Sequence, residues 1–225
     1  MGVGAPIYPV GLVVKGRRCL VVGGGRVAAR KIAGLLACGA AVTVVAPEVH
    51  VAIAELSDSG VIAAIDESPL EVHIRPYASG EAADYVLVIS ATGDPAVDET
   101  VRRDAQSAGV WVNVADDPSR CSFVLPAVAR DGAVSIAVST AGASPALAGW
   151  LRDLVAAALG PGMGDLAALL DEGRRRIHDQ GESTESIDWR SLLDGPLPDM
   201  VRRGDMDQAR SELDAFLRNQ GAPPS

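Results

Sequence analysis

Short apolar runs alternate with amphipathic helical patterns along the first half of the chain. The runs that are rich in β-branched residues predict buried strands, namely RCLVVGGG at 18–25, AVTVVAP at 41–47, DYVLVISATGD at 84–94 and VWVNVADD at 110–117. Between these runs, apolar residues at helical spacing predict helices over 26–40, 49–60 and 95–109. Strands that alternate with helices predict an α/β fold with a parallel sheet and right-handed crossovers.

Weaker strand candidates lie between the second and third of these runs. VIAAIDE occupies 61–67 and VHIRPY occupies 72–77. Both segments are short and only partly apolar, so the pattern leaves open which of them joins the main sheet.

The pattern changes after Asp116. Residues 121–140 contain two apolar strands joined at the RDG sequence of 130–132, and Asp-Gly is typical of a β-hairpin. The run SPALAGWLRDLVAAAL predicts a helix that Ser144 caps and in which Pro145 takes the first position. The more polar remainder predicts helices broken by GPGMG and DGPLPD.

A hairpin that follows a completed sheet needs a surface to cover its apolar side. We therefore expect a homodimer built on residues 118–155. The expected divisions of the chain are a parallel-sheet domain over 1–116, a β-hairpin dimerisation and substrate segment over 117–159, and a helical C-terminal tail over 160–225.

Composition narrows the class of protein without identifying it. Apolar residues make up 48% of the 225 residues, which is typical of a globular chain. The net charge of −9 argues against a general binder of nucleic acid or of anionic membranes. The cysteines form no CxxC pair, and Cys19 and Cys38 fall in apolar segments, so we expect buried thiols in a reducing cytoplasm. The N-terminal residues do not have the pattern of a signal peptide.

The glycine turn after the first strand carries the main chemical signal. Residues 23–28 fit the pattern G-x-G-x-x-A between a strand and a helix, which is the context of a dinucleotide-binding fingerprint. In such a turn Gly23 allows the sharp bend, Gly24 follows it, and Gly25 lets a pyrophosphate approach the backbone. Ala28 lets the helix lie close to the strand, and the N–H groups at the helix N-terminus face the anion. This pattern predicts a Rossmann-type sheet, although an ordinary glycine-rich turn is the alternative.

The ends of the neighbouring strands supply further candidates for cofactor binding. Glu48, directly after Pro47, is the nearest acidic residue that could reach the adenosine ribose, but it is also typical of a solvated helix start. The turn after the second strand contains no arginine that could bind a 2′-phosphate, which favours NAD over NADP. Ala91 and Thr92 are candidates for contact with the nicotinamide half, and the same residues fit a tight turn in which Asp94 caps the next helix.

Several stretches of the chain together resemble the precorrin-2 dehydrogenase family, the NAD-dependent module of siroheme synthase. They are YPVGLVVKGRRCLVVGGGRVAARK, VTVVAP, ATGDPAVDETV, VNVADDPSRCSFVLPA and IAVSTAGASPALAGWLR, and they cover about residues 6–155. The resemblance implies oxidation of precorrin-2 to sirohydrochlorin with NAD as the hydride acceptor. It also implies a dimer, and in some members the insertion of ferrous iron to give siroheme.

The resemblance assigns roles to individual residues. It implies that Asp116, after the last parallel strand, is the catalytic carboxylate, and it ranks the adjacent Asp117 second. The cofactor contacts of the family correspond to Arg26 and Val27 after the glycine turn and to Pro47 and Glu48 after the second strand.

Chemical reasoning from the residues agrees with this assignment. Precorrin-2 oxidation releases a proton together with a hydride, and a carboxylate at the carboxyl edge of a sheet can accept that proton. A turn or cap before Pro118 is the purely structural reading of Asp116. Ser139, Thr140 and Ser144 lie between a strand and a helix start, where N–H groups would bind a substrate carboxylate; capping by Ser144 is compatible with this role.

No metal site is expected, because His50, His73 and His178 are isolated in the sequence. The sequence leaves two alternatives open. The first is a dehydrogenase of this type without chelatase activity. The second is a non-catalytic NAD-sensing module, which would need neither an aspartate after the last strand nor the STAGASPALA helix start.

Overall fold

The computed structural model describes residues 6–58, 70–181, 183–185 and 187–220, and the chain divides into two compact units. The first unit runs to Leu125 and also includes Ala141–Ala143. The second unit contains Pro126–Thr140 and the chain from Ser144 onward. Each unit is described by itself below, and the three-part division expected from the sequence stays a prediction.

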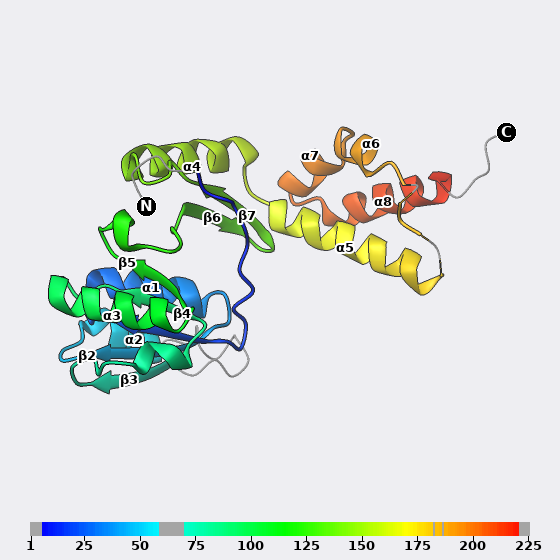
Figure 1. The fold of residues 1–225 in the computed structure, drawn as a ribbon. Coiled ribbons are helices and arrows are strands. Elements are labelled where there is room, and N and C mark those ends of the chain that lie inside the picture. The colour runs from blue at the N-terminus through cyan, green and yellow to red at the C-terminus, as the bar shows by residue number, and fades with distance from the viewer. Residues whose placement is uncertain (1–5, 59–69, 182, 186, 221–225) are drawn as a thin grey trace. The chain divides into compact units, whose positions relative to one another are not determined.

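The first unit is built on a five-stranded parallel sheet in the order β3-β2-β1-β4-β5 (Figure 1). Its strands are β1 (Arg18–Val22), β2 (Ala41–Ala46), β3 (Leu70–Ile74), β4 (Leu87–Ser90) and β5 (Trp111–Val114). Its helices are α1 (Arg26–Leu36), α2 (Val51–Asp58) and α3 (Pro95–Ser107), with short 3₁₀ helices η1 (Glu81–Asp84) and η2 (Pro118–Arg120). The expected α/β fold with a Rossmann-type sheet is therefore confirmed.

Both faces of the sheet are buried along β1, β2, β4 and β5, which explains the nearly continuous apolar runs of these four strands. In β1 the side chains of Cys19 and Val21 join the core cluster that includes Ile32 of α1. Leu20 and Val22 point to the opposite face and join the cluster that includes Val101 of α3. Alternating side chains of one strand thus hold helices on the two sides of the sheet.

Helix ends follow local signals that the sequence carries. Asp94 caps α3 by accepting hydrogen bonds from the N–H groups of Ala96 at 2.8 Å and Val97 at 3.4 Å, with Pro95 in the first position. Gly109 then adopts a positive φ of 69° where α3 ends, a conformation that favours glycine. The predicted limits of α3 are confirmed to within two residues.

Three details differ from the sequence-based expectation or fall outside the structure. VHIRPY contributes to β3, which pairs with β2 in the main sheet, whereas VIAAIDE lies outside the described residues. Cys38 was expected to be buried but is exposed, because α1 ends at Leu36 and Cys38 lies in the turn that follows. Cys19 and Cys121 are buried.

The second unit begins with an antiparallel hairpin of β6 (Ala127–Asp131) and β7 (Val134–Val138), which packs against α4 (Pro145–Leu159). The turn lies one residue later than Asp-Gly predicts, because Asp131 pairs with Val134 and leaves Gly132-Ala133 at the tip. Ser144 caps α4 as predicted, accepting a hydrogen bond from the N–H of Leu147 at 3.2 Å.

The helical tail follows α4 in the same unit. It comprises α5 (Met163–Asp179), α6 (Trp189–Leu193), α7 (Leu197–Arg202) and α8 (Met206–Gln220). A separate apolar cluster, which includes the fully buried Leu197 and Leu213, holds these helices together. No single helix within the described ranges is long and apolar enough to cross a membrane, although α4 and α5, bent by 61°, pass by length and composition as a pair.

Candidate functional site

The carboxyl edge of the parallel sheet contains a topological switch point between β1 and β4. Strands β2 and β3 lie on one side of β1, and strands β4 and β5 lie on its other side. Connections that leave neighbouring strands in opposite directions open a crevice at this edge, and α/β proteins bind ligands there. The glycine turn follows β1 and the Ser90–Thr92 segment follows β4, so both flank the crevice.

The fold itself requires the first two glycines of the turn. Gly23 has a φ of 119°, and a Cβ at this residue would lie 2.2 Å from the carbonyl oxygen of Ala91. A Cβ at Gly24 would lie 1.8 Å from the carbonyl oxygen of Glu48. Side chains therefore cannot fit at either residue, and the close approach fixes the turn between the ends of β2 and β4.

Gly25 is different, because the protein itself gives no reason for a glycine there. Its φ is −82°, and a Cβ would meet nothing within 4 Å. Gly25 is exposed and precedes α1 without any side-chain cap, and Arg26 and Val27 form the first turn of the helix. The open space lies beside the unpaired N–H groups of a helix N-terminus, which fits the pyrophosphate of a dinucleotide.

The segment after β2 lies beside the glycine turn, as the sequence predicted. The N–H of His50 donates to the carbonyl of Gly24 at 2.7 Å, and the Glu48 carbonyl packs against the same glycine. The side chains of Pro47 and Glu48 are exposed at this corner. Glu48 is therefore placed where a ribose-binding carboxylate stands in a Rossmann sheet, while its role stays a prediction.

An arginine that the sequence analysis did not consider lies one strand further along. Arg75 directly follows β3, and its N–H donates to the carbonyl of Ala46 at 3.0 Å. Its guanidinium, however, is bound by both carboxylate oxygens of Glu81 at 2.6 and 2.9 Å. The hydrogen bond from Arg75 lowers the pKa of the Glu81 carboxyl. An arginine engaged in this bidentate pair is a poor partner for a 2′-phosphate, which favours NAD.

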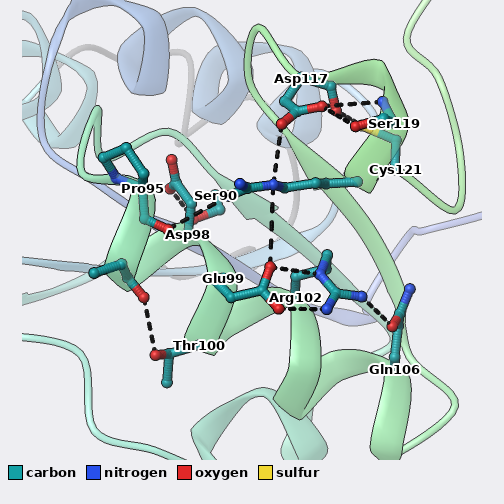
Figure 2. A network of polar contacts seen from close by, with 12 residues as sticks. Ser90, Pro95, Asp98, Glu99, Thr100, Arg102, Gln106, Asp117, Ser119 and Cys121 are labelled. Atoms are coloured by element: carbon teal, nitrogen blue, oxygen red, sulfur yellow. Dashed lines mark hydrogen bonds and ion pairs between the residues drawn. The ribbon is translucent and has the colours of Figure 1, made fainter.

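The turn after β4 is held by a buried carboxylate. Asp98, on the first turns of α3, accepts hydrogen bonds from the hydroxyls of Ser90 at 2.6 Å and Thr92 at 2.7 Å. Figure 2 shows Ser90 and Asp98 next to each other. Ala91 and Thr92 are half-buried at the crevice, in the place expected for contacts with the nicotinamide half.

The two aspartates after β5 have different surroundings. Asp117 caps η2, accepting hydrogen bonds from the N–H of Ser119 at 3.1 Å and from the Ser119 hydroxyl at 2.5 Å (Figure 2). Asp117 also pairs with Arg120 at 3.0 Å. These hydrogen bonds from Ser119, together with the charge of Arg120, lower the pKa of the Asp117 carboxyl. Asp117 therefore holds the loop together.

Asp116 has a positive φ of 63° and is exposed. Its carboxylate makes no hydrogen bond within the part of the chain that the structure describes. A carboxylate without a hydrogen-bond partner among the described residues is available to a ligand, and this distinguishes Asp116 from Asp117.

A cation near Asp116 was not evident from the sequence. Burial and the neighbouring Arg30 lower the pKa of the Lys31 ammonium, and the negative charge of Asp116 acts in the opposite direction. Lys31 lies on α1, 85 positions before Asp116 in the numbering of the chain, so no local pattern could have paired them. The surroundings of Asp116 thus include a half-buried positive charge.

The three candidate substrate residues belong to the second unit. The Thr140 hydroxyl accepts a hydrogen bond from the N–H of Ser144 at 3.0 Å and lies 3.0 Å from the Ser144 carbonyl. The Ser144 hydroxyl caps α4. Ser139 is exposed at the end of β7. Thr140 and Ser144 therefore shape the start of α4, and contact with a substrate stays a prediction for all three.

The histidines provide no metal-binding cluster. Within the described ranges, no group of three or more His, Cys, Asp or Glu side chains is placed to hold a metal ion.

Fold and crevice together define a dinucleotide-binding protein of the Rossmann class. Residues 10–127 match a family model described as putative NAD(P)-binding, which agrees with the expected cofactor. Residues 131–158 match a second model, described as the central part of a sirohaem biosynthesis protein. The chain belongs to the siroheme synthase and precorrin-2 dehydrogenase family, as the resemblance indicated.

Individual relatives support this assignment. Siroheme synthase from Nitrosococcus oceani is 37% identical over 96% of this chain and 45% of its own length. Siroheme synthase from Azotobacter vinelandii is 35% identical over 94% of this chain and 44% of its own length. The chain thus spans a little under half of these relatives. The solved structure of SirC, a precorrin-2 dehydrogenase, superposes with a TM-score of 0.70 at 30% identity, covering 95% of this chain and 98% of SirC.

Proposed function

We propose that this protein oxidises precorrin-2 to sirohydrochlorin, with NAD as the hydride acceptor, in siroheme biosynthesis. The observation that carries the proposal is the likeness to SirC over nearly the whole length of both chains. The crevice supports it independently, because the open space at Gly25 follows β1 and the Asp116 carboxylate, which has no hydrogen bond among the described residues, follows β5 at the same edge of the sheet.

In this proposal the cofactor binds across the switch point. Gly25, Arg26 and Val27 hold the pyrophosphate at the N-terminus of α1. Pro47 and Glu48 contact the adenosine ribose, and Ala91 and Thr92 contact the nicotinamide half. The bound NAD accepts the hydride.

Asp116 accepts the proton that leaves the substrate with the hydride. A general base must have a free lone pair within reach of the substrate, and the Asp116 carboxylate has no competing hydrogen bond among the described residues. The positive charge of Lys31 is among the groups that interact with Asp116. Asp117 supports the loop and contributes to catalysis only indirectly.

Ser139, Thr140 and Ser144 bind a carboxylate of the tetrapyrrole. The support is their place at the start of α4, whose first N–H groups favour an anion. This binding mode suits a substrate that carries many carboxylates.

The protein acts as a homodimer in the cytoplasm. The support for a dimer is an exposed apolar face of α4, where Leu147, Trp150 and Leu154 are 46%, 60% and 51% exposed. These residues are three and four positions apart and therefore share one side of the helix. A second copy of this chain would remove that surface from water. The buried thiols of Cys19 and Cys121 fit a reducing compartment.

Insertion of ferrous iron is the second candidate activity, with iron as a substrate rather than as a resident metal. The observation that favours it is the same unused carboxylate at Asp116, which could accept the pyrrole protons that the entering metal displaces. A dehydrogenase without this activity, and a non-catalytic NAD-sensing module, are the alternatives.

One anaerobic assay separates these functions. Purified protein is mixed with precorrin-2 and NAD, and NADH formation and the sirohydrochlorin spectrum are followed; ferrous iron is then added. Stoichiometric NADH and sirohydrochlorin are expected. Binding of NAD without turnover would support the sensing module, and sirohydrochlorin that resists iron would leave a dehydrogenase only.

A further inference from the structure

Asp98 is a buried carboxylate for which the proposed reaction has no role. It is 8% exposed, and it lies in the first unit on α3. One of its oxygens, Oδ1, accepts hydrogen bonds from the hydroxyls of both Ser90 and Thr92. Ser90 is fully buried at the end of β4, and Thr92 is half-buried two residues later. Asp98 therefore joins the end of a strand to the turn that follows it.

The Thr92 hydroxyl is fixed in direction by these contacts. Its oxygen accepts a hydrogen bond from the N–H of Asp94 at 3.0 Å, and its proton has two acceptors within reach. They are the Asp98 carboxylate at 2.7 Å and the carbonyl of Asp94 at 3.2 Å. The shorter contact to a carboxylate is the stronger one, so the proton points to Asp98. The segment from residue 90 to residue 94 is thus held from inside the protein.

The same segment forms one wall of the crevice. The N–H of Ala91 donates to the carbonyl of Val22 at 2.7 Å. The Ala91 carbonyl lies so close to the glycine turn that a Cβ at Gly23 would be 2.2 Å away. Any displacement of the residues that Asp98 holds would therefore change the space between the end of β4 and the glycine turn.

We propose that Asp98 is a positioning residue for the dinucleotide: by fixing Ser90 and Thr92 it sets the wall of the crevice against which the cofactor binds. The inference rests on the proposed function only in that the crevice binds NAD or NADH. It predicts that loss of the Asp98 acceptor weakens cofactor binding, whether or not precorrin-2 is present.

The same helix offers a matched control in Asp104. Its carboxylate accepts hydrogen bonds from the hydroxyls of Tyr77 at 3.1 Å and Ser79 at 3.1 Å, and from the N–H of Gly80 at 2.7 Å. Asp104 thus holds a loop as Asp98 does. The loop held by Asp104 precedes β4, whereas the turn held by Asp98 follows β4. Removal of either carboxylate destabilises the fold, whereas only Asp98 should affect the cofactor.

The test is titration of the full chain with NADH, followed by nicotinamide fluorescence, alongside thermal unfolding. Asp98→Ala should raise the dissociation constant about tenfold, as expected when hydrogen bonds to a carboxylate are lost. Asp98→Asn keeps an oxygen at the shared acceptor position, so its affinity should stay within about threefold of the original. Asp104→Ala should bind NADH like the unaltered protein.

Affinity that is unchanged in Asp98→Ala, with a stability loss like that of Asp104→Ala, would overturn the inference and leave the proposed function intact. If Asp98→Ala does not fold, Thr92→Val replaces it, because this variant keeps the Ser90–Asp98 hydrogen bond. Normal NADH affinity in Thr92→Val would then reject the inference. No binding of NADH to the unaltered protein would instead reject the proposed function itself.

Discussion

The three successive glycines after β1 are required for different reasons. Gly23 and Gly24 have no room for a side chain because carbonyl oxygens of Ala91 and Glu48 occupy that space. Gly25 faces open space in an ordinary backbone conformation. The first two glycines therefore serve the fold, and the third serves a ligand.

Gly25→Ala should weaken NAD binding at least tenfold, because its Cβ would enter the space in which the pyrophosphate approaches the backbone. Gly34→Ala is the matched control, since Gly34 lies on the same helix and a Cβ there also meets nothing within 4 Å. Calorimetry with NAD measures both variants. Equal affinity in the two would exclude pyrophosphate binding at Gly25.

Asp116→Asn should lower the rate of precorrin-2 oxidation by about two to four orders of magnitude, the range that general acid–base catalysis supplies. An amide is nearly the same size but cannot accept the proton, so the affinity for NAD should not change. Single-turnover kinetics of NADH formation measures the step.

The control for this variant is Asp117→Asn, which weakens the contacts to Ser119 and Arg120. It should reduce the rate less than Asp116→Asn and should lower stability more. The opposite order of rates would assign the catalytic role to Asp117.

Cys19 should make stability depend on alkaline pH. Burial, with a smaller contribution from Cys38, raises the pKa of the Cys19 thiol from 9.0 to about 11. The thiol of the unfolded chain therefore loses its proton at a lower pH than the thiol of the folded chain. The contribution of Cys19 to the free energy of unfolding is complete below pH 9 and is lost as the pH rises toward about 11. The loss over this whole interval should be about 3 kcal/mol, because the folded and unfolded thiols differ by about two pKa units and each corresponds to roughly 1.4 kcal/mol.

Urea unfolding at pH 8 and at a pH near 10.5 measures this change in the free energy of unfolding. Cys19→Ala should lose less stability than the unaltered protein over the same interval. Parallel pH profiles for the two proteins would show that other groups cause the decline.

At the residue scale, sequence reasoning reached those features that local patterns encode. It located the glycine turn and the aspartates that follow β5, because glycine spacing and strand ends are local, while the catalytic role of Asp116 stays a prediction. It missed Asp98, which reads as an ordinary helix residue until Ser90 and Thr92 are seen around it. It also missed Lys31, because the interaction of Lys31 with Asp116 joins residues that are distant in the sequence. It mistook Cys38 for a buried thiol, because the exposure of Cys38 depends on where α1 ends.

At the scale of elements, helix starts were predictable and strand pairing was not. Asp94-Pro95 and Ser144-Pro145 cap α3 and α4 as their sequences indicate, because a cap requires only a few neighbouring residues. The membership of β3 in the sheet depends on its partner β2, which no local pattern reveals. The hairpin turn was displaced by one residue for the same reason, since register is set by pairing.

The apolar face of α4 should hold the proposed dimer together. Trp150→Glu places a charge where Trp150 is 60% exposed, and burial of an unpaired charge in an interface is unfavourable. Sedimentation at micromolar concentration should show a dimer for the unaltered protein and a monomer for this variant. Asp153→Asn, at an exposed polar residue of the same helix, is the control and should stay dimeric. A dimeric Trp150→Glu variant would place the interface elsewhere.

At the scale of the whole molecule, the chain contains separate apolar cores. Two clusters cover the faces of the parallel sheet, and a third lies among α5, α6, α7 and α8 in the other unit. All of the candidate cofactor residues belong to the first unit. The helical tail was predictable as helical, but its core was not, because its members come from distant helices.

Leu213→Ala should lower the free energy of unfolding of the helical tail by about 2 to 5 kcal/mol, the usual effect of a cavity in a packed core. Leu213 is 1% exposed, and Trp189 packs beside the same cluster and reports its unfolding by fluorescence. Affinity for NADH should not change. Leu20→Ala, in the core of the sheet, is the comparison and should reduce stability and cofactor binding together.

The uncapped start of α1 has an evolutionary consequence. Gly25 occupies the N-cap position, where Ser, Asp or Asn would stabilise the helix more than glycine does. In a descendant that no longer used the cofactor, Gly23 and Gly24 would persist because the fold excludes other residues, whereas position 25 would drift toward a capping residue. The residue at position 25 therefore distinguishes a member that still binds the cofactor from one that has kept only the fold.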